Sequence, residues 1–383
     1  MKMTKYKLGE LVEVTRGASL SGQFYAEEGK LIRLTLGNFN MNGGGFKENT
    51  SKTDLYFTGT VRDEFILNKG DIITPLTEQS LGLLGTTARI PESGKYIQSQ
   101  DVALVRCKEG LLDPNFCYYL ISSSIVRQQL SAAAQQTKIR HTSPEKIKDC
   151  TVWVPDFYTQ KNIGRILTDI DNKIAINRRI NDNLEAQLRL ITSRYIFSCP
   201  NLEKKRIGEI ATVKAGGDCP ITFSKTRTQK CNIPIFSNGT EDRGLYGFTN
   251  KANIEGHSIT VAARGTIGYC ERRLMPFVPI IRLLAITPKE DGAYIYLHQV
   301  IRGMKFKKNG SVQQQLTVPE ISFIEIPYPH SRVLHEYNKV ASPIVEMIER
   351  NISENEILTK QRNELLPLLM NGQATVNYHL SAC

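Results

Sequence analysis

The sequence predicts a mixed α/β (α+β) fold, in which two similar globules are each followed by one long helix. Three observations lead to this prediction. Two apolar heptad segments lie 174 residues apart, the regions before them share a series of motifs in the same order, and most of the positive charge lies between them. Self-similarity at a fixed separation sets the architecture of a chain, so the sequence is interpreted as an internal repeat.

Each long helix is predicted by mostly apolar residues that recur at alternating spacings of three and four. In the first segment they are Ile163, Leu167, Ile170, Ile174, Asn177, Asn181, Leu184, Leu188 and Ile191. In the second they are Tyr337, Ala341, Ile344, Ile348, Asn351, Asn355, Leu358, Arg362 and Leu365. Such a stripe packs against another helix, and polar residues within it fix the register of the pair. If the two helices pair antiparallel as a coiled coil, Asn177 lies near Asn355 and Asn181 lies near Asn351, and the pair forms a register-locked spacer.

The two globules carry matched motifs. Leu8-Gly9-Glu10-Leu11 opens the first and Ile207-Gly208-Glu209-Ile210 opens the second, and a strand ending in proline closes each, at Pro155 and Pro327. A proline after a strand marks the entry to the following helix. The predicted domains are a first globule at 1–154, a central helix at 155–200, a second globule at 201–327, a C-terminal helix at 328–372 and a tail at 373–383.

The charge distribution indicates a polyanionic partner. The chain has 383 residues and a formal net charge of +11. Residues 201–327 hold 18 basic and 11 acidic residues, whereas residues 1–154 hold 19 and 16. A basic globular region favours nucleic acid as the partner. No apolar run reaches the roughly 18 residues of a membrane span, and the eight cysteines are scattered singly, which predicts reduced thiols in a cytoplasmic protein.

The sequence predicts no catalytic or metal site and no cofactor for this chain. A glycine-rich S-adenosylmethionine loop and a phosphate-binding GxxxxGK[ST] loop are both missing from it, and Gly43-Gly44-Gly45 has no helix-opening fingerprint. Pro155-Asp156 with Asp171-Asn172-Lys173 has a nuclease-like spacing, but the second element falls inside the heptad helix. The six histidines do not form an HxxxH pair of the kind that binds zinc.

The arrangement resembles the specificity subunit of type I restriction–modification systems over the whole chain. The resemblance rests on the run from Ile170 to Asn181 followed by Leu184-Glu185, and on Val154-Pro155 with Gln160. It also rests on the repeated Gly-Glu openings and on the turn Arg264-Gly265-Thr266-Ile267-Gly268. The first globule departs from the pattern, because Thr86-Thr87-Ala88-Arg89 stands after its glycine turn in place of an Arg-Gly-Thr turn.

The resemblance implies two target recognition domains, each reading one half of a bipartite, asymmetric site on double-stranded DNA. It implies a non-catalytic subunit that recruits two methyltransferase subunits and the restriction subunits, on which S-adenosylmethionine, ATP and Mg are expected. The alternative is a non-catalytic protein-interaction adaptor, with two globular modules on a coiled-coil spacer.

Base reading needs Arg, Asn, Gln or Lys side chains, and loops are the expected place for them. In the first globule the candidates are Asn38, Asn40, Asn42, Gln79, Arg89 and Gln136. In the second they are Lys225, Arg227, Asn238, Arg243, Arg264, Lys307 and Gln313. Arg264 is the best-placed candidate, because it lies in a glycine turn that matches the family motif.

Overall fold

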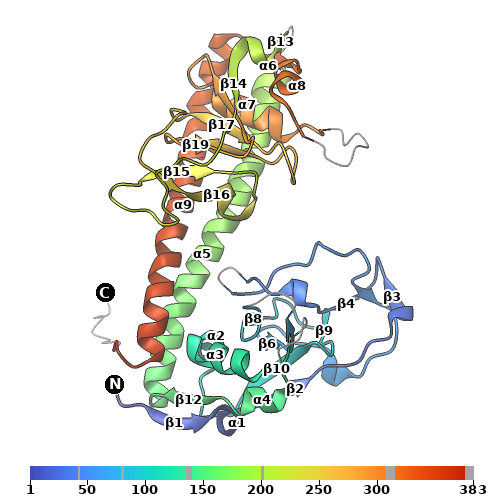
Figure 1. The fold of residues 1–383 in the computed structure, drawn as a ribbon. Helices are drawn as coiled ribbons and strands as arrows, with labels where there is room; N and C mark the ends of the chain where they lie inside the picture. The colour runs from blue at the N-terminus through green and yellow to red at the C-terminus, as the bar shows by residue number, and fades with distance from the viewer. Residues whose placement is uncertain (42–43, 79–81, 135–139, 200–201, 307–314, 376–383) are drawn as a thin grey trace. The chain divides into compact units, whose positions relative to one another are not determined.

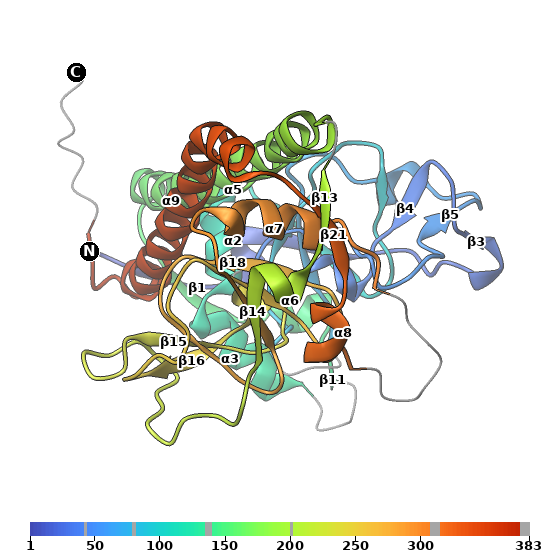
Figure 2. The ribbon, with the colours of Figure 1, turned by 90° about the horizontal axis from the view of Figure 1, so that it is seen from above.

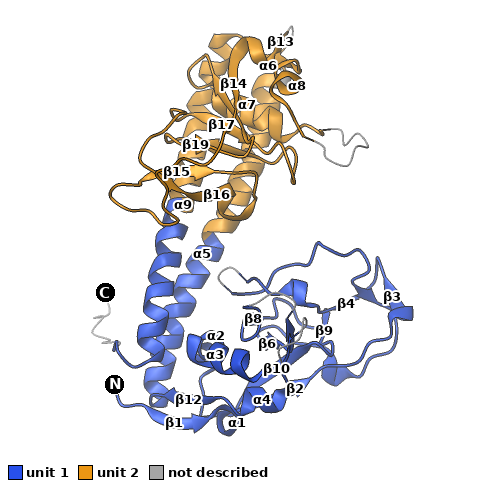
Figure 3. Ribbon diagram, viewed as in Figure 1, with its two compact units in different colours: residues 1–176, 353–383 blue, residues 177–352 orange. Residues whose placement is uncertain are grey.

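The computed structural model describes residues 1–41, 44–78, 82–134, 140–199, 202–306 and 315–375. The chain divides into two compact units (Figure 3). Unit 1 comprises residues 1–176 and 353–383, and unit 2 comprises residues 177–352. Each unit therefore contains one globule together with parts of both long helices, α5 (Phe157–Thr192) and α9 (Ser331–Met370).

The globule of unit 1 is built on a four-stranded antiparallel sheet with the order β2-β10-β6-β8 (Figure 1). A smaller sheet has the order β3-β5-β4-β9, and two further strand pairs join β1 to β12 and β7 to β11. The strands are β1 (Thr4–Lys7), β2 (Val12–Arg16), β3 (Tyr25–Ala26), β4 (Leu31–Arg33), β5 (Tyr56–Phe57), β6 (Ile72–Pro75), β7 (Thr77–Glu78), β8 (Ala88–Arg89), β9 (Tyr96–Ile97), β10 (Val102–Cys107), β11 (Arg140–His141) and β12 (Thr151–Val154). The helices are α1 (Leu8–Leu11), α2 (Pro114–Ser122), α3 (Ser124–Ala133) and α4 (Pro144–Lys148), with 3-10 turns η1 (Gly22–Phe24), η2 (Leu36–Asn38) and η3 (Asp63–Phe65).

The globule of unit 2 repeats this plan. Its main sheet has the order β14-β20-β17-β18, a second sheet has the order β16-β15-β19, and β13 pairs with β21. The strands are β13 (Glu203–Arg206), β14 (Ala211–Ala215), β15 (Ile233–Phe236), β16 (Leu245–Thr249), β17 (Ser258–Val261), β18 (Cys270–Arg273), β19 (Val278–Pro279), β20 (Leu284–Pro288) and β21 (Glu325–Tyr328). The helices are α6 (Ile207–Ile210), α7 (Ala293–Arg302) and α8 (Val318–Ser322), with a 3-10 turn η5 (Glu241–Gly244) and a π-helical segment η4 (Ser193–Phe197) that follows α5.

The predicted mixed fold and internal repeat are confirmed. The two opening motifs both form one-turn helices, and in each the glutamate accepts a hydrogen bond from the backbone three residues before it. Lys7 N donates to Glu10 Oε2 at 2.6 Å, and Arg206 N donates to Glu209 Oε2 at 3.0 Å. Such bonds satisfy backbone donors that the start of a helix leaves unpaired. The shared motif therefore records a shared local structure.

Each globule packs its own core against the long helices of its own unit. In unit 1, Phe116 of α2 is buried with Ile163 and Leu167 of α5. In unit 2, Tyr296 of α7 is buried with Tyr337 of α9, and α7 can be followed beside the sheet in Figures 1 and 2. The heptad stripe is therefore part of the core in both units. Each large apolar side chain buried there contributes about 1.5–3 kcal/mol to stability.

Within each unit the two long helices run antiparallel. In unit 2, the hydroxyls of Thr192 and Tyr337 lie 2.9 Å apart, and Asn351 Nδ2 donates to Asn181 Oδ1 at 2.8 Å. The predicted pairing of Asn181 with Asn351 is therefore confirmed. Asn177 is buried in unit 2 and Asn355 is half-buried in unit 1, and their pairing stays a prediction.

The second long helix begins before its proline. α9 starts at Ser331 and continues through Pro343, which is exposed. No described helix combines the length and the apolar composition that crossing a membrane requires.

Candidate nucleic-acid interface

The candidate DNA-reading residues fall into three groups in the structure. Asn42, Gln79, Gln136, Lys307 and Gln313 lie outside the described residues. Four others have side chains that hold the fold together, and the remaining four lie in loops or turns at the surface or partly exposed. The four structural ones correct the expectation drawn from the sequence, and each has a distinct physical reason.

Asn38 holds its own loop. Its side chain is almost fully buried, and its Oδ1 accepts hydrogen bonds from the backbone N–H of Thr35 at 2.9 Å and from the Thr35 hydroxyl at 3.1 Å. Its Nδ2 donates to the carbonyl of Lys47 at 3.2 Å. A buried amide whose oxygen and nitrogen already form hydrogen bonds within its own loop is poorly placed to bind a base edge. We therefore remove Asn38 from the candidates.

Arg89 is a strand residue that packs inward. It lies at the end of β8, where its guanidinium is stacked over the Tyr118 ring at 4.7 Å. Strand register makes Arg89 the counterpart of Arg272, because Arg89 pairs with Ile72 on β6 as Arg272 pairs with Ile259 on β17. Both arginines face the helices of their own unit, so Arg89 is also removed from the candidates.

Arg243 joins its loop to β18 and α9. Its Nε donates to Glu271 at 2.8 Å, and its two terminal nitrogens donate to the carboxylate of Glu349 at 2.9 and 3.0 Å. Burial by itself would lower the pKa of Arg243, but the carboxylates of Glu271 and Glu349 raise it overall. This guanidinium is committed to two carboxylates and is removed from the candidates.

Asn238 links two loops of unit 2. Its Nδ2 donates to the carbonyl of Ile281 at 2.6 Å, and its Oδ1 accepts from the backbone N–H of Ala263 at 2.8 Å. Both bonds go to backbone atoms in other segments. Asn238 is therefore a residue that positions neighbouring turns, and we remove it from the residues expected to touch bases directly.

Arg264 lies in the exposed turn between β17 and β18, as the sequence predicted for a surface turn. Its guanidinium is oriented by Gln315, whose Oε1 accepts from Arg264 Nε at 3.1 Å and from Nη2 at 2.6 Å. Gln315 was not among the candidates, which included only Gln313 from the same glutamine run. Nothing in the sequence distinguishes the three glutamines, since the partner turn lies 51 residues away.

The other described candidates lie at or near the surface. Lys225 and Arg227 are exposed, and Lys225 Nζ lies 5.1 Å from the centre of the Tyr246 ring and donates to the Tyr246 carbonyl at 3.1 Å. Asn40 is half-exposed in unit 1, and its backbone N–H donates to the carbonyl of Gly45 at 3.0 Å. Basic and amide groups of this kind suit contacts to phosphates and to base edges.

A buried charge network attaches β18 and α7 to the long helix α5 in unit 2. The Glu185 carboxylate accepts from Arg272 and from Arg302, the latter at 2.7 Å. Arg272 Nη1 also donates to His298 Nδ1 at 2.9 Å. Burial lowers the pKa of His298 well below its ordinary value, and the neighbouring guanidinium groups of Arg272 and Arg302 lower it further. These residues hold a scaffold. Glu185 belongs to a motif on which the family resemblance rests, whereas Arg272, His298 and Arg302 were not among the candidate residues.

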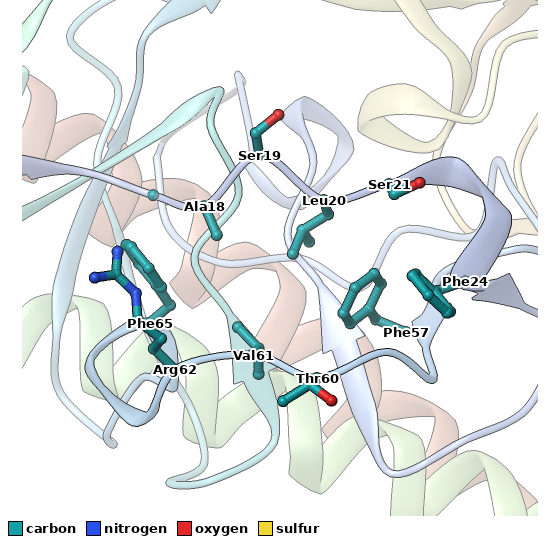
Figure 4. Close-up of a pocket in the computed structure, with 11 residues that line it drawn as sticks. Ala18, Ser19, Leu20, Ser21, Phe24, Phe57, Thr60, Val61, Arg62 and Phe65 are labelled. Carbon is teal, nitrogen blue, oxygen red and sulfur yellow. The ribbon is translucent and has the colours of Figure 1, made fainter.

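A pocket or a group of metal ligands among the described residues could mark a site of another kind. A pocket of about 480 Å³ in unit 1 is lined by Leu20, Phe24, Phe57, Val61 and other side chains shown in Figure 4. Its charged group, Arg62, is paired with Glu64 at 2.9 Å. Among the described residues, no three or more His, Cys, Asp or Glu side chains group as metal ligands.

Comparison with known proteins identifies the family. A family model described as "Type I restriction modification DNA specificity domain" matches residues 1–186 and again 201–366. A putative type I specificity subunit of Mycoplasma pneumoniae is 31% identical over 186 residues, which span 46% of this chain and 56% of that protein.

Two further proteins match along most of the chain. Another putative type I specificity subunit of M. pneumoniae is 22% identical, with 90% of each chain covered. The crystal structure of a type I restriction-modification S subunit from M. genitalium shares the fold, with a TM-score of 0.60, 19% identity, and 97% of this chain and 96% of that chain covered. The chain therefore belongs to the family of type I restriction-modification specificity subunits, which recognise DNA sequence.

Proposed function

We propose that this chain reads a bipartite, asymmetric site on double-stranded DNA, with the globule of each unit reading one half. The observation that carries the proposal is the pairing of one repeated scaffold with two different sets of surface side chains. The main sheets have matching strand orders. The turn after β17 holds Arg264 in unit 2, and the turn after the matching strand β6 in unit 1 has a different sequence. A shared frame with divergent turns suits two related but different DNA sequences.

The proposed readers are the candidates that the structure leaves available. They are Asn40 in unit 1 and Lys225, Arg227 and Arg264 in unit 2, together with Asn42, Gln79, Gln136, Lys307 and Gln313 outside the described residues. Arg264 has the strongest support, because Gln315 holds its guanidinium in one orientation at the surface. A guanidinium held in this way suits two hydrogen bonds to the edge of guanine.

We also propose that the chain is non-catalytic and acts through partners. The long helices would keep the register of the two recognition parts, and the Asn181–Asn351 pair supports this role because a slipped pairing would leave half-buried amides unpaired. Two methyltransferase subunits and the restriction subunits would supply S-adenosylmethionine, ATP and Mg chemistry. We propose a cytoplasmic location, which suits a protein that acts on DNA.

The test is to express the full chain with a type I methyltransferase subunit from the same source and to map methylated adenines in the host genome by single-molecule sequencing. We expect one motif with two different specified halves separated by unspecified bases. The absence of any motif, with the complex formed, would contradict DNA reading and favour a protein-interaction adaptor. The same expression without this chain is the control.

A further inference from the structure

We infer that the turn at Ile281 and Arg282 is a second DNA-reading element of unit 2, and that Asn238 positions it beside the Arg264 turn. The inference rests on the proposed function and extends it to Ile281 and Arg282, which neither the sequence motifs nor the family motif singled out. It assigns Arg282 to direct base contact and Asn238 to a positioning role.

The turn has an unusual backbone. Ile281 has φ of +53° and Arg282 has φ of +63°, so two consecutive residues with side chains adopt the left-handed region. That region is disfavoured for residues that carry a Cβ, and most of all for a β-branched residue such as isoleucine. Strained backbone of this kind persists only where its surroundings fix it, and it clusters at functional sites.

The surroundings of the turn do fix it. The backbone N–H groups of Ile281 and Arg282 donate to the carbonyls of Gly217 at 2.8 Å and Gly216 at 3.0 Å. From the other side, Asn238 Nδ2 donates to the Ile281 carbonyl at 2.6 Å. Three hydrogen bonds therefore hold a two-residue turn, while its side chains stay outside: Ile281 is 49% exposed and Arg282 is exposed.

Asn238 also connects this turn to the turn that carries Arg264. Asn238 Oδ1 accepts from the N–H of Ala263, the residue immediately before Arg264. The amide of Asn238 thus bridges the backbones of the two turns, and each turn carries one exposed arginine. Two exposed arginines on neighbouring turns suit recognition of adjacent bases, because each can donate two hydrogen bonds to guanine in the major groove.

The repeat shows that this position varies in chemistry between the globules. Strand register places Gln100 and Asp101 of unit 1 at the positions of Ile281 and Arg282. The unit 1 turn is also supported by a side chain, since Arg16 Nε donates to the Gln100 carbonyl at 2.8 Å. An equivalent turn that presents glutamine and aspartate in one globule, and isoleucine and arginine in the other, suits recognition of different half-sites.

The test uses the full chain in complex with its methyltransferase subunit and a randomised duplex DNA library, with bound sequences read by sequencing. Variants Arg282→Ala and Asn238→Ala are compared with Arg264→Ala, which marks the half read by unit 2. We expect both to reduce the base preference in that same half by about 5- to 150-fold at the affected positions. Preference in the other half should be unchanged, which also shows that the complex is folded.

The control is Arg332→Ala, which removes an exposed arginine of the same unit from the start of α9. It should leave both halves unchanged. The inference is overturned if Arg282→Ala alters the preference by less than about twofold, which is below the value of one good base contact. It is also overturned if Asn238→Ala weakens both halves equally, as a purely structural residue would. If the unaltered complex selects no motif, the proposed function fails and this inference fails with it.

Discussion

The two globules make the same contact with the long helices but place the small residue on opposite sides. In unit 1, Gly164 lies on the long helix, and a Cβ there would come within 2.6 Å of the Phe116 backbone at the start of α2. In unit 2 the equivalent helix position is Asn338, and the glycine is Gly292 at the start of α7, where a Cβ would lie 2.4 Å from the asparagine side chain. Both units keep this close approach between the long helix and the start of a short helix, although the glycine that permits it lies on a different helix in each.

The polar attachments differ in the same way. In unit 1, Tyr119 of α2 donates to Asp171 at 2.6 Å, and Arg362 donates to the same carboxylate at 2.7 Å. In unit 2 the carboxylate is Glu185, and its arginine partners come from β18 and α7. The comparison teaches that the repeat preserves where the helices attach, and that each unit stabilises the attachment with its own side chains.

The largest expected effect comes from removing the α5 carboxylate to which each globule is attached. Glu185→Ala would leave Arg272, which is almost fully buried, without its carboxylate, at a cost of about 3–5 kcal/mol. Asp171→Ala removes a more exposed carboxylate and should cost about 1.5–3 kcal/mol. Hydrogen exchange in β18 and in α2 measures the two losses separately. Glu364→Ala, an exposed control on α9, should change stability little. Equal losses from Glu185→Ala and Asp171→Ala would contradict the difference between units.

The next effect separates two arginines that the sequence could not tell apart. Arg243→Ala removes the guanidinium that pairs with Glu271 and Glu349, so we expect a loss of about 2–3 kcal/mol in the stability of unit 2. Arg264→Ala should change stability by less than about 0.5 kcal/mol and weaken specific DNA binding instead. Thermal unfolding and DNA titration of the two variants measure both quantities. The reverse pattern would show that the roles are exchanged.

A pH effect is expected in unit 2 through His298. Its pKa is lowered in the fold, so it is uncharged there, whereas the unfolded chain binds a proton below about pH 6.5. Stability from this group is therefore complete above that pH and falls as the pH decreases, by at most about 1.4 kcal/mol per pH unit. Hydrogen exchange of β18 amides between pH 7.5 and pH 5.5 measures it. His298→Asn should remove this slope, and an unchanged slope would assign it to another group.

The smallest effect concerns the asparagine pair. Asn181→Ala or Asn351→Ala should each cost about 1 kcal/mol, because each leaves the other amide short of a partner. The double variant should cost less than the sum of the two, by a coupling that a double-mutant cycle measures. Strict additivity would indicate that the 2.8 Å hydrogen bond contributes nothing to stability.

The fold was predictable because its signals are periodic. Apolar residues at spacings of three and four give the long helices, and repeated motifs such as Leu8-Gly9-Glu10 give the doubled globule. The pairing of Asn181 with Asn351 followed from the same pattern, since a twofold-related antiparallel pair brings equivalent positions together. Both features follow from patterns that repeat along the chain, which a single sequence displays.

The candidate site was less predictable because arginine and asparagine serve structure and DNA binding equally well. Arg243 and Arg264 both lie in polar, glycine-containing segments, yet one binds Glu349, 106 residues away, and the other lies at the surface. The sequence around Arg89 does not show that its side chain packs inward. The strand register of the structure, which matches Arg89 with Arg272, shows it. Long-range partners decide these roles, and a single sequence does not display them.

We expect the two globules to read different half-sites independently, and a competition measurement can show this. Four duplexes carry the selected site intact, with one half scrambled, with the other half scrambled, or with both scrambled. Their affinities are measured for the unaltered complex and for Arg264→Ala. We expect Arg264→Ala to lose discrimination for one half alone and to retain it for the other. Equal loss in both halves, or no loss in either, would contradict it.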